Sequence, residues 1–122
     1  MKHVVSIEDL DKKTTIDILK RAKQLIPIAK GKKKSKILDG KILATCFFEP
    51  STRTRLSFEC AMQRLGGTCI GFTEPSTTSH LKGETLSDAI KMIAGYSDAI
   101  VLRQLHQNIR LSFLLRLREF LL

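Results

Sequence analysis

Three short apolar runs with helix-type segments between them constrain the fold more than any other feature of this sequence. The first run, residues 42–48, is continuous and of strand length, which is typical of a strand buried on both faces. Shorter runs follow at 68–72 and 98–103. The segments between them carry apolar residues at helical spacing. The order strand–helix–strand–helix–strand predicts an α/β fold, a parallel sheet with helices on both faces and right-handed crossovers.

The helix-type segments have recognisable starts and ends. Asp11 followed by Thr14 is a candidate helix start, and helical spacing of apolar residues predicts a helix over about 11–29, disturbed at Pro27. We expect the next helix to stop at Gly66. Its expected apolar face consists of Leu56, Phe58, Ala61, Met62 and Leu65. The apolar positions expected in a third helix, which ends near Gly95, are Leu86, Ala89, Ile90 and Ile93.

The formal net charge of +9 is concentrated in one stretch. Residues 30–36 contribute +5, residues 37–103 carry seven charges of each sign, and the segments before and after contribute +2 each. The lysine run holds a glycine and no aromatic residue, which is typical of a solvated loop rather than a nucleic-acid-binding surface. We therefore expect no nucleic-acid partner, although the overall charge keeps a nucleic-acid-binding protein as a rival hypothesis.

Membrane insertion and metal binding find no support in the sequence. No apolar run approaches the ~18 residues of a transmembrane helix, and the first residues lack the apolar stretch of a signal peptide. We therefore expect a cytoplasmic chain with no membrane partner. Cys46, Cys60 and Cys69 form no C-x-x-C pair and no Cys/His spacing typical of zinc. We expect three buried free thiols and no metal site.

The segment richest in polar chemistry directly follows the first strand. Residues 51–55 read Ser-Thr-Arg-Thr-Arg at an expected helix start. A helix N-terminus offers unpaired N–H groups and a partial positive charge, hydroxyls add donors, and an arginine can grip two phosphate oxygens. The carboxyl end of a parallel strand is also where open α/β sheets bind ligands. These features predict an anion site, and the alternative is that Ser51 or Thr52 only caps the helix.

A longer stretch around these residues matches a known family. Residues 47–59 read Phe-Phe-Glu-Pro-Ser-Thr-Arg-Thr-Arg-Leu-Ser-Phe-Glu, which resembles the carbamoyl-phosphate motif of the aspartate and ornithine carbamoyltransferases. The Phe-Phe-Glu-Pro opening and Lys-Gly-Glu-Thr-Leu at 82–86 resemble the aspartate branch, and residues 98–103 resemble the family's next strand. The resemblance covers roughly residues 1–103. It implies transfer of the carbamoyl group from carbamoyl phosphate to L-aspartate, giving N-carbamoyl-L-aspartate and phosphate in pyrimidine biosynthesis, without a cofactor or metal.

The resemblance also implies roles for individual side chains. Those that would bind carbamoyl phosphate are Ser51, Thr52, Arg53, Thr54, Thr78, Ser79, Lys82 and Arg103. Those that would act in catalysis are Arg53, Thr54, Lys82 and Arg103. Lys82, with Thr78 or Ser79 before it, would lie on a loop that enters a neighbouring subunit's site, so the family works as a homotrimer. Without the family, Lys82 could be a solvated loop residue and Arg103 could pair with a carboxylate.

The resemblance ends after Arg103. The family continues with a His-Pro pair and later a second domain that binds aspartate, whereas residues 104–122 are apolar and basic. We expect a partial carbamoyl-phosphate-binding domain over 1–103, an anomalous tail over 104–122 and no aspartate-binding domain. An abnormal end, a terminal helix docked on the sheet and a lipid-surface helix are alternatives for the tail.

Without an aspartate site, we expect the chain to carry only the carbamoyl-phosphate half of the reaction. The alternatives are a non-catalytic fragment or a module that binds phosphate or carbamoyl phosphate, and an ornithine-type carbamoyltransferase. The residues that choose the second substrate are not recognisable in these 122 residues, so only the motifs at 47–50 and 82–86 separate the two branches.

Overall fold

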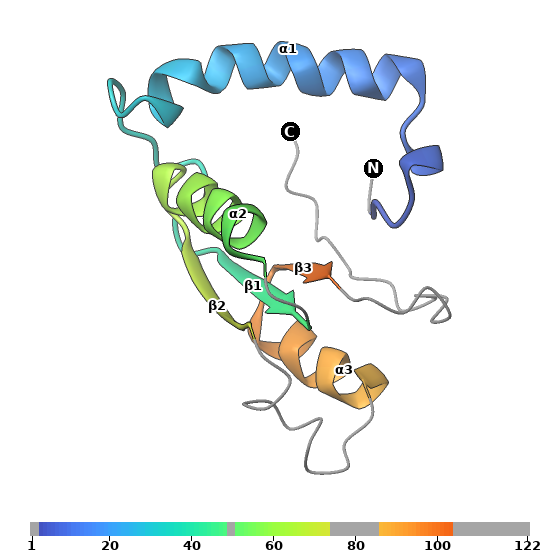
Figure 1. Cartoon of the computed structure of the whole chain (residues 1–122). Coiled ribbons are helices and arrows are strands. Elements are labelled where there is room, and N and C mark those ends of the chain that lie inside the picture. The colour runs from blue at the N-terminus through green and yellow to red at the C-terminus, as the bar shows by residue number, and fades with distance from the viewer. Residues whose placement is uncertain (1–2, 49–50, 74–85, 104–122) are drawn as a thin grey trace.

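A computed structural model describes residues 3–48, 51–73 and 86–103. Strand- and helix-forming segments alternate as the apolar runs predict (Figure 1). The elements, in chain order, are a short 3-10 helix Ile7–Asp9, α1 Lys12–Ala29, β1 Ile42–Phe47, α2 Thr52–Arg64, β2 Thr68–Phe72, α3 Leu86–Tyr96 and β3 Ala99–Arg103.

The three strands form one parallel sheet in the order β2-β1-β3. β1 lies in the middle, and Thr45 is paired with Gly71 of β2 on one side and with Val101 of β3 on the other. Five of the six residues of β1 are buried, as expected for a strand covered on both faces. The parallel α/β fold predicted from the sequence is therefore confirmed.

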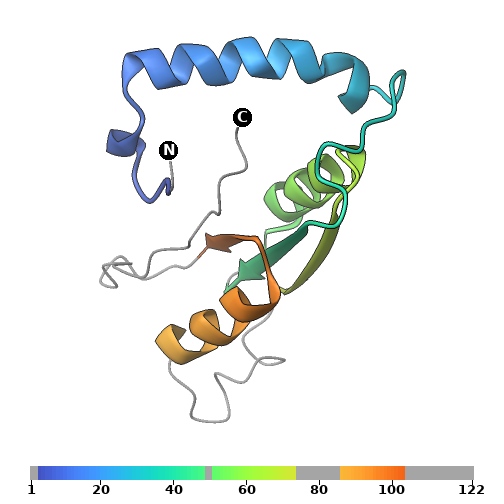
Figure 2. The same cartoon turned by 180° about the vertical axis from the view of Figure 1, so that it is seen from behind.

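The two faces of the sheet are covered by different helices (Figures 1 and 2). Side chains alternate along β1, so Ala44 and Cys46 lie on one face while Thr45 and Phe47 lie on the other. The first face packs against α3. The buried cluster there consists of Ala44, Cys46, Ile90, Ile93 and Ile100, with Phe48, Phe72 and Leu102 packed beside it. α2 covers the second face, because Glu59 of α2 contacts Thr45.

The face that α2 turns to the sheet differs from the one predicted. Leu56 is 50% exposed and Phe58 is 42% exposed, and Met62 is the buried residue of this helix. The contact with β1 is made instead by Glu59, three residues before Met62 and therefore on the same face of the helix. The predicted apolar face is therefore right at Met62 and wrong at Leu56 and Phe58, and a polar residue of α2, Glu59, makes the contact with the sheet.

α1 begins and ends close to its predicted limits. Asp11 is its N-cap, and the carboxylate of Asp11 accepts a hydrogen bond from the Thr14 N–H at 2.7 Å. Pro27 does not interrupt the helix, which continues to Ala29, although proline lacks the N–H that would donate to the Lys23 carbonyl. In both views α1 lies away from the sheet (Figures 1 and 2), and Ile28 is its one buried residue.

Two surface features bear on the predictions from charge and cysteine content. The lysine run follows α1 on exposed backbone, as expected for a solvated loop. Of the three free thiols, Cys46 is buried, Cys69 is half-buried and Cys60 is exposed on α2, so the prediction of three buried thiols is wrong. Cys60 is exposed because α2 buries only the opposite side of its surface.

No helix among the described residues is long and apolar enough to cross a membrane.

Candidate functional site

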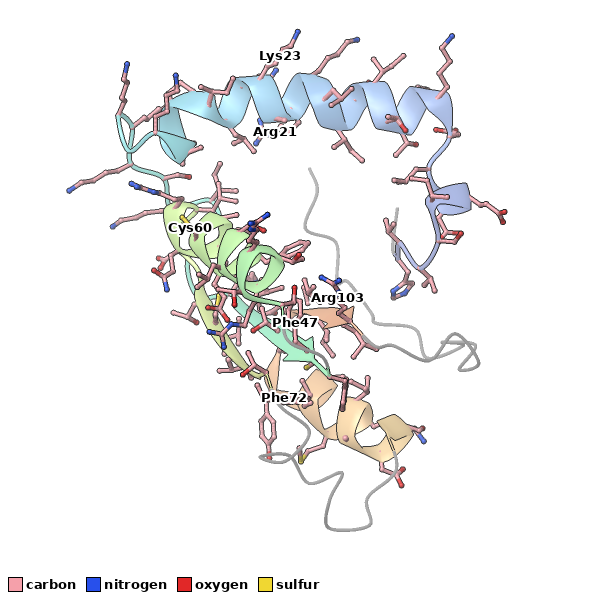
Figure 3. All side chains as sticks on the ribbon, viewed as in Figure 1. Arg21, Lys23, Phe47, Cys60, Phe72 and Arg103 are labelled. Atoms are coloured by element: carbon pink, nitrogen blue, oxygen red, sulfur yellow. The ribbon has the colours of Figure 1, made fainter. Side chains whose placement is uncertain are left out.

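The start of α2 and the end of β3 meet at the carboxyl edge of the sheet. β1 leads toward α2, and the last residue of β1, Phe47, is paired with Arg103 at the end of β3 (Figure 3). The Phe48 N–H donates to the Arg103 carbonyl at 3.0 Å, which extends the pairing to this edge. Open parallel sheets bind ligands outside the carboxyl ends of their strands. The polar residues predicted from the sequence therefore lie where such a fold would bind a ligand.

Arg103 is directed toward α2 by the alternation of side chains along its strand. It is the register partner of Phe47 and shares the sheet face that α2 covers. Its guanidinium Nη1 donates to Ser51 Oγ at 2.8 Å and to Thr54 Oγ1 at 3.3 Å. A permanently charged group is thus held against two hydroxyls at the start of a helix.

Ser51 does not act as a side-chain cap, although it is the N-cap residue of α2. Its hydroxyl makes no hydrogen bond to the first turn of the helix. The hydroxyl accepts from Arg103 instead. The helical hydrogen bonding of α2 begins at Arg55, whose N–H donates to the Ser51 carbonyl at 3.3 Å. The N–H groups of residues 52–54 precede that first helical bond, as at every helix start, and can serve an anion.

Thr52 and Arg53 complete the first turn of α2, and both side chains are exposed. Within the part of the chain that the structure describes, Arg53 has no hydrogen bond or ion pair. It is consequently a cation available to a ligand. Of the eight predicted site residues, Ser51, Thr54 and Arg103 are brought together by direct contact, and Thr52 and Arg53 flank them.

The remaining predicted residues, Thr78, Ser79 and Lys82, lie outside the described residues. Among the described residues, no group of three or more His, Cys, Asp or Glu side chains could hold a metal ion. The groups assembled at this edge are the Arg53 and Arg103 guanidinium ions, three hydroxyls and a helix N-terminus. All are donors or cations, so the arrangement suits a small oxyanion such as a phosphate group.

The sequence did not reveal a polar contact between β1 and α2, which lies beside the candidate site. Thr45 donates from its hydroxyl to Glu59 Oε1 at 2.9 Å, and Arg55 Nε lies 3.7 Å from the same carboxylate oxygen. The available signal was a threonine in the middle of an otherwise apolar strand. A buried hydroxyl requires a partner, but the sequence alone does not tell which residue supplies it.

Comparison with protein families gives one matching model. Residues 2–116 match the model described as "Aspartate/ornithine carbamoyltransferase, carbamoyl-P binding domain". The aspartate carbamoyltransferase catalytic subunit of Methanococcus aeolicus is 56% identical over 103 residues, which are 84% of this chain and 33% of that protein. The Archaeoglobus fulgidus catalytic subunit is 54% identical over 103 residues, 84% of this chain and 34% of that protein.

Solved structures agree with these relatives in fold and in sequence. The catalytic subunit of M. jannaschii aspartate transcarbamoylase matches with a TM-score of 0.82 and 50% identity, covering 88% of this chain and 36% of that one. Aspartate transcarbamoylase from Trypanosoma cruzi, in complex with carbamoyl phosphate and aspartate, matches with a TM-score of 0.77 and 34% identity, covering 84% and 33%. The chain thus spans about one third of the length of the relatives that it matches.

Proposed function

Because the chain belongs to the aspartate and ornithine carbamoyltransferase family, we propose that it supplies the carbamoyl-phosphate half of an aspartate carbamoyltransferase site. The reaction transfers the carbamoyl group from carbamoyl phosphate to L-aspartate and yields N-carbamoyl-L-aspartate and phosphate, a step of pyrimidine biosynthesis. The aspartate branch is favoured over the ornithine branch because the relatives with 54% and 56% identity are named aspartate carbamoyltransferases.

The observation that carries this proposal is the contact of Arg103 with Ser51 and Thr54 at the start of α2. In the proposed complex, the N–H groups of the first turn, the hydroxyls and Arg53 hold the phosphate. Thr54 and Arg103 reach the carbamoyl oxygen as well. Two of these groups are already hydrogen-bonded to Arg103, so little ordering is needed when the ligand arrives.

Charge development explains why donors and cations suffice for this chemistry. The aspartate amine attacks the carbamoyl carbon, a C–N bond forms, the C–O bond to phosphate breaks, and the amine loses a proton to the surroundings. Negative charge grows on the carbamoyl oxygen and on the departing phosphate. Fixed donors aimed at these oxygens stabilise the transition state, and loss of one typically slows such a reaction about 10²- to 10³-fold.

The rest of the active site is a proposal from family resemblance. Lys82, with Thr78 or Ser79, would enter the site of a neighbouring chain in a cytoplasmic homotrimer. We propose that residues 1–103 belong to a carbamoyl-phosphate-binding domain; the match to the family model continues to residue 116, beyond the limit expected from the motifs. A non-catalytic module that binds phosphate or carbamoyl phosphate is the second candidate, since the groups gathered at the start of α2 suit an anion and none of them is specific for aspartate.

Calorimetric titration of the whole chain with carbamoyl phosphate, and separately with phosphate, tests the shared anion site. We expect both to bind and Arg53→Ala to abolish carbamoyl-phosphate binding, because Arg53 is the exposed cation of the first turn. Arg64→Ala is the matched control, since Arg64 lies at the opposite end of α2. Binding of carbamoyl phosphate by Arg53→Ala with the affinity of the unmodified chain would contradict the assignment.

A further inference from the structure

A polar cluster lies between α2 and the centre of the sheet, away from the candidate ligand. Thr45 is 1% exposed and is the one buried polar residue of the described chain. Its hydroxyl donates to Glu59 Oε1 at 2.9 Å and lies 3.4 Å from the Ile70 carbonyl oxygen. Buried hydroxyls are nearly always hydrogen-bonded, and a bond to a carboxylate is among the stronger ones. The contact joins the middle strand to the middle of α2.

The cluster continues along α2 toward the candidate site. Arg55 Nε lies 3.7 Å from Glu59 Oε1, one helical turn away, and the two side chains are 33% and 25% exposed. Arg55 Nε is buried and has no hydrogen-bond partner among the described residues, so this ion pair is its compensation. We call Thr45, Glu59 and Arg55 the Glu59 cluster. It runs from the sheet to the first turn of α2.

Strand β2 leaves room for this cluster. Gly71 is the register partner of Thr45 and has φ +156°. A Cβ at this position would overlap the Thr45 carbonyl oxygen and lie 2.5 Å from the Thr45 hydroxyl. Any larger residue would therefore displace the donor that holds Glu59. On the same side, Cys69 Sγ lies 3.9 Å from the Glu59 carbonyl oxygen.

Apolar packing does little to hold the N-terminal half of α2. Leu56 and Phe58 are 50% and 42% exposed, and the buried residue of the helix is Met62, near its C-terminal end. Apolar contact is also non-directional and tolerates sliding, whereas a hydrogen bond weakens steeply with distance and angle. Apart from the Arg103 hydrogen bonds themselves, the Glu59 cluster is therefore the directional contact with the sheet nearest the first turn among the described residues.

We propose that the Glu59 cluster sets the position of α2 on β1 and so holds Ser51 and Thr54 within hydrogen-bond reach of Arg103. Glu59 and Thr45 are positioning residues, because they touch neither Arg103 nor the first-turn amides. Ser51 precedes Glu59 by eight residues, about two helical turns, so a shift at the cluster is transmitted along a rigid helix. A displacement of about 1 Å would break the 2.8 Å contact of Arg103 with Ser51.

The test compares Thr45→Val with Thr45→Ser in the full chain. Valine keeps the shape and removes the donor, whereas serine keeps the donor. For Thr45→Val we expect phosphate affinity to fall about fivefold or more, since a typical hydrogen bond contributes about 1 kcal/mol. We expect Thr45→Ser to restore the affinity. Glu59→Gln, which removes the charge that compensates Arg55, should show a loss in the same direction and serves if Thr45→Val does not fold.

A control separates positioning from general stability. Met62→Ala removes apolar packing of α2 without touching the cluster, so it should lower the unfolding midpoint while the phosphate dissociation constant stays within about twofold. A second readout needs no ligand: the NMR signals of the Arg103 guanidinium report its contact with Ser51 and Thr54. We expect them to shift in Thr45→Val and to be unchanged in Met62→Ala.

This inference rests on the proposed function, but the two can fail separately. Phosphate binding tests both, whereas the Arg103 signals test the role of the cluster alone. If the unmodified chain binds neither phosphate nor carbamoyl phosphate, the proposed function fails, and the Arg103 signals still decide the role of the cluster. If a folded Thr45→Val chain, or Glu59→Gln in its place, retains the original Arg103 signals, the inference is overturned. Equal loss of phosphate affinity in Met62→Ala and Thr45→Val would also overturn it, because the effect would then be one of stability alone.

Discussion

At the scale of single residues, the candidate site depends on a pairing across about fifty positions of sequence. Arg103 contacts Ser51 and Thr54, which are 52 and 49 residues away. Both hydrogen bonds leave from the same guanidinium nitrogen, Nη1, which carries two N–H groups and can serve both hydroxyls at once. A lysine in its place would keep the charge and lose this geometry. The ligand-binding surface is therefore partly organised by the protein's own side chains.

Cys46 and Cys60 are expected to react very differently with iodoacetamide. Burial raises the pKa of the Cys46 thiol to about 12, whereas Cys60 is exposed. The thiolate is the reactive form, so at about pH 8 the thiolate fraction of Cys46 is on the order of a thousandfold below that of an ordinary cysteine. Mass spectrometry should find Cys60 alkylated and Cys46 unmodified. Denaturant should make Cys46 reactive, and rapid labelling of Cys46 in the folded chain would contradict its burial.

At the scale of elements, α1 and α2 begin in chemically different ways. Asp11 caps α1 with a carboxylate that accepts a hydrogen bond from the Thr14 amide, so one of the unpaired N–H groups of that helix start is satisfied by a side chain. At the same position of α2, the Ser51 hydroxyl accepts a hydrogen bond from Arg103 and makes no hydrogen bond to an amide of the helix. The first helix start is closed by its own side chain. The second has no side-chain cap, and its first amides lie where we propose that an anion binds.

The start of α1 should be sensitive to acid. Hydrogen bonds from the Thr14 side chain and amide lower the pKa of Asp11 below the ordinary aspartate value of 3.8. A lowered pKa means that this stabilisation is present above about pH 3.8 and is lost as pH falls through the pKa of the folded state. NMR shifts of the first turn of α1 should therefore show fraying on acidification. Asp11→Ala should show the same fraying at neutral pH.

Asp17→Asn is the control for this prediction, since Asp17 lies inside α1 and does not cap it. This variant should keep the first turn of α1 ordered at neutral pH and should retain the acid transition. A first turn that stays helical in Asp11→Ala at neutral pH would show that the cap contributes little.

At the scale of the whole molecule, the excess charge does not coincide with the candidate site. The lysine run lies on an exposed loop after α1, whereas residues 37–103 are net neutral and contain Arg53 and Arg103. A small anion is selected by the placement of a few cations and amides, and net charge governs only longer-range attraction. The chain also spans about one third of the length of its relatives.

The purified chain is expected to bind phosphate and to have little or no transferase activity. Catalysis requires both reactants to be held together, and no aspartate site is proposed within these residues. The assay is formation of carbamoyl aspartate from carbamoyl phosphate and aspartate, with an intact relative such as the Methanococcus aeolicus catalytic subunit as positive control. Turnover at the rate of that relative would refute the non-catalytic expectation for the isolated chain.

Local patterns determined the element order, the parallel sheet and the polar segment that opens α2. Apolar periodicity and capping residues act over a few neighbours, so strand and helix limits were predicted to within about two residues. The family motif added the residues of the anion site. Ser51, Thr54 and Arg103 were named from the sequence, but their contact was not deducible from spacing.

Only the tertiary structure decided which side chains meet. The order β2-β1-β3 brings the end of β3 beside the start of α2, and no periodicity encodes that order. The same holds for the contact of Thr45 with Glu59 and for the exposure of Phe58, which the apolar pattern placed on the buried face. A prediction from helical spacing takes the apolar residues of a helix to be the ones that face the core. Here a buried hydroxyl of β1 pairs with a carboxylate of α2, a contact that a pattern of apolar residues does not describe.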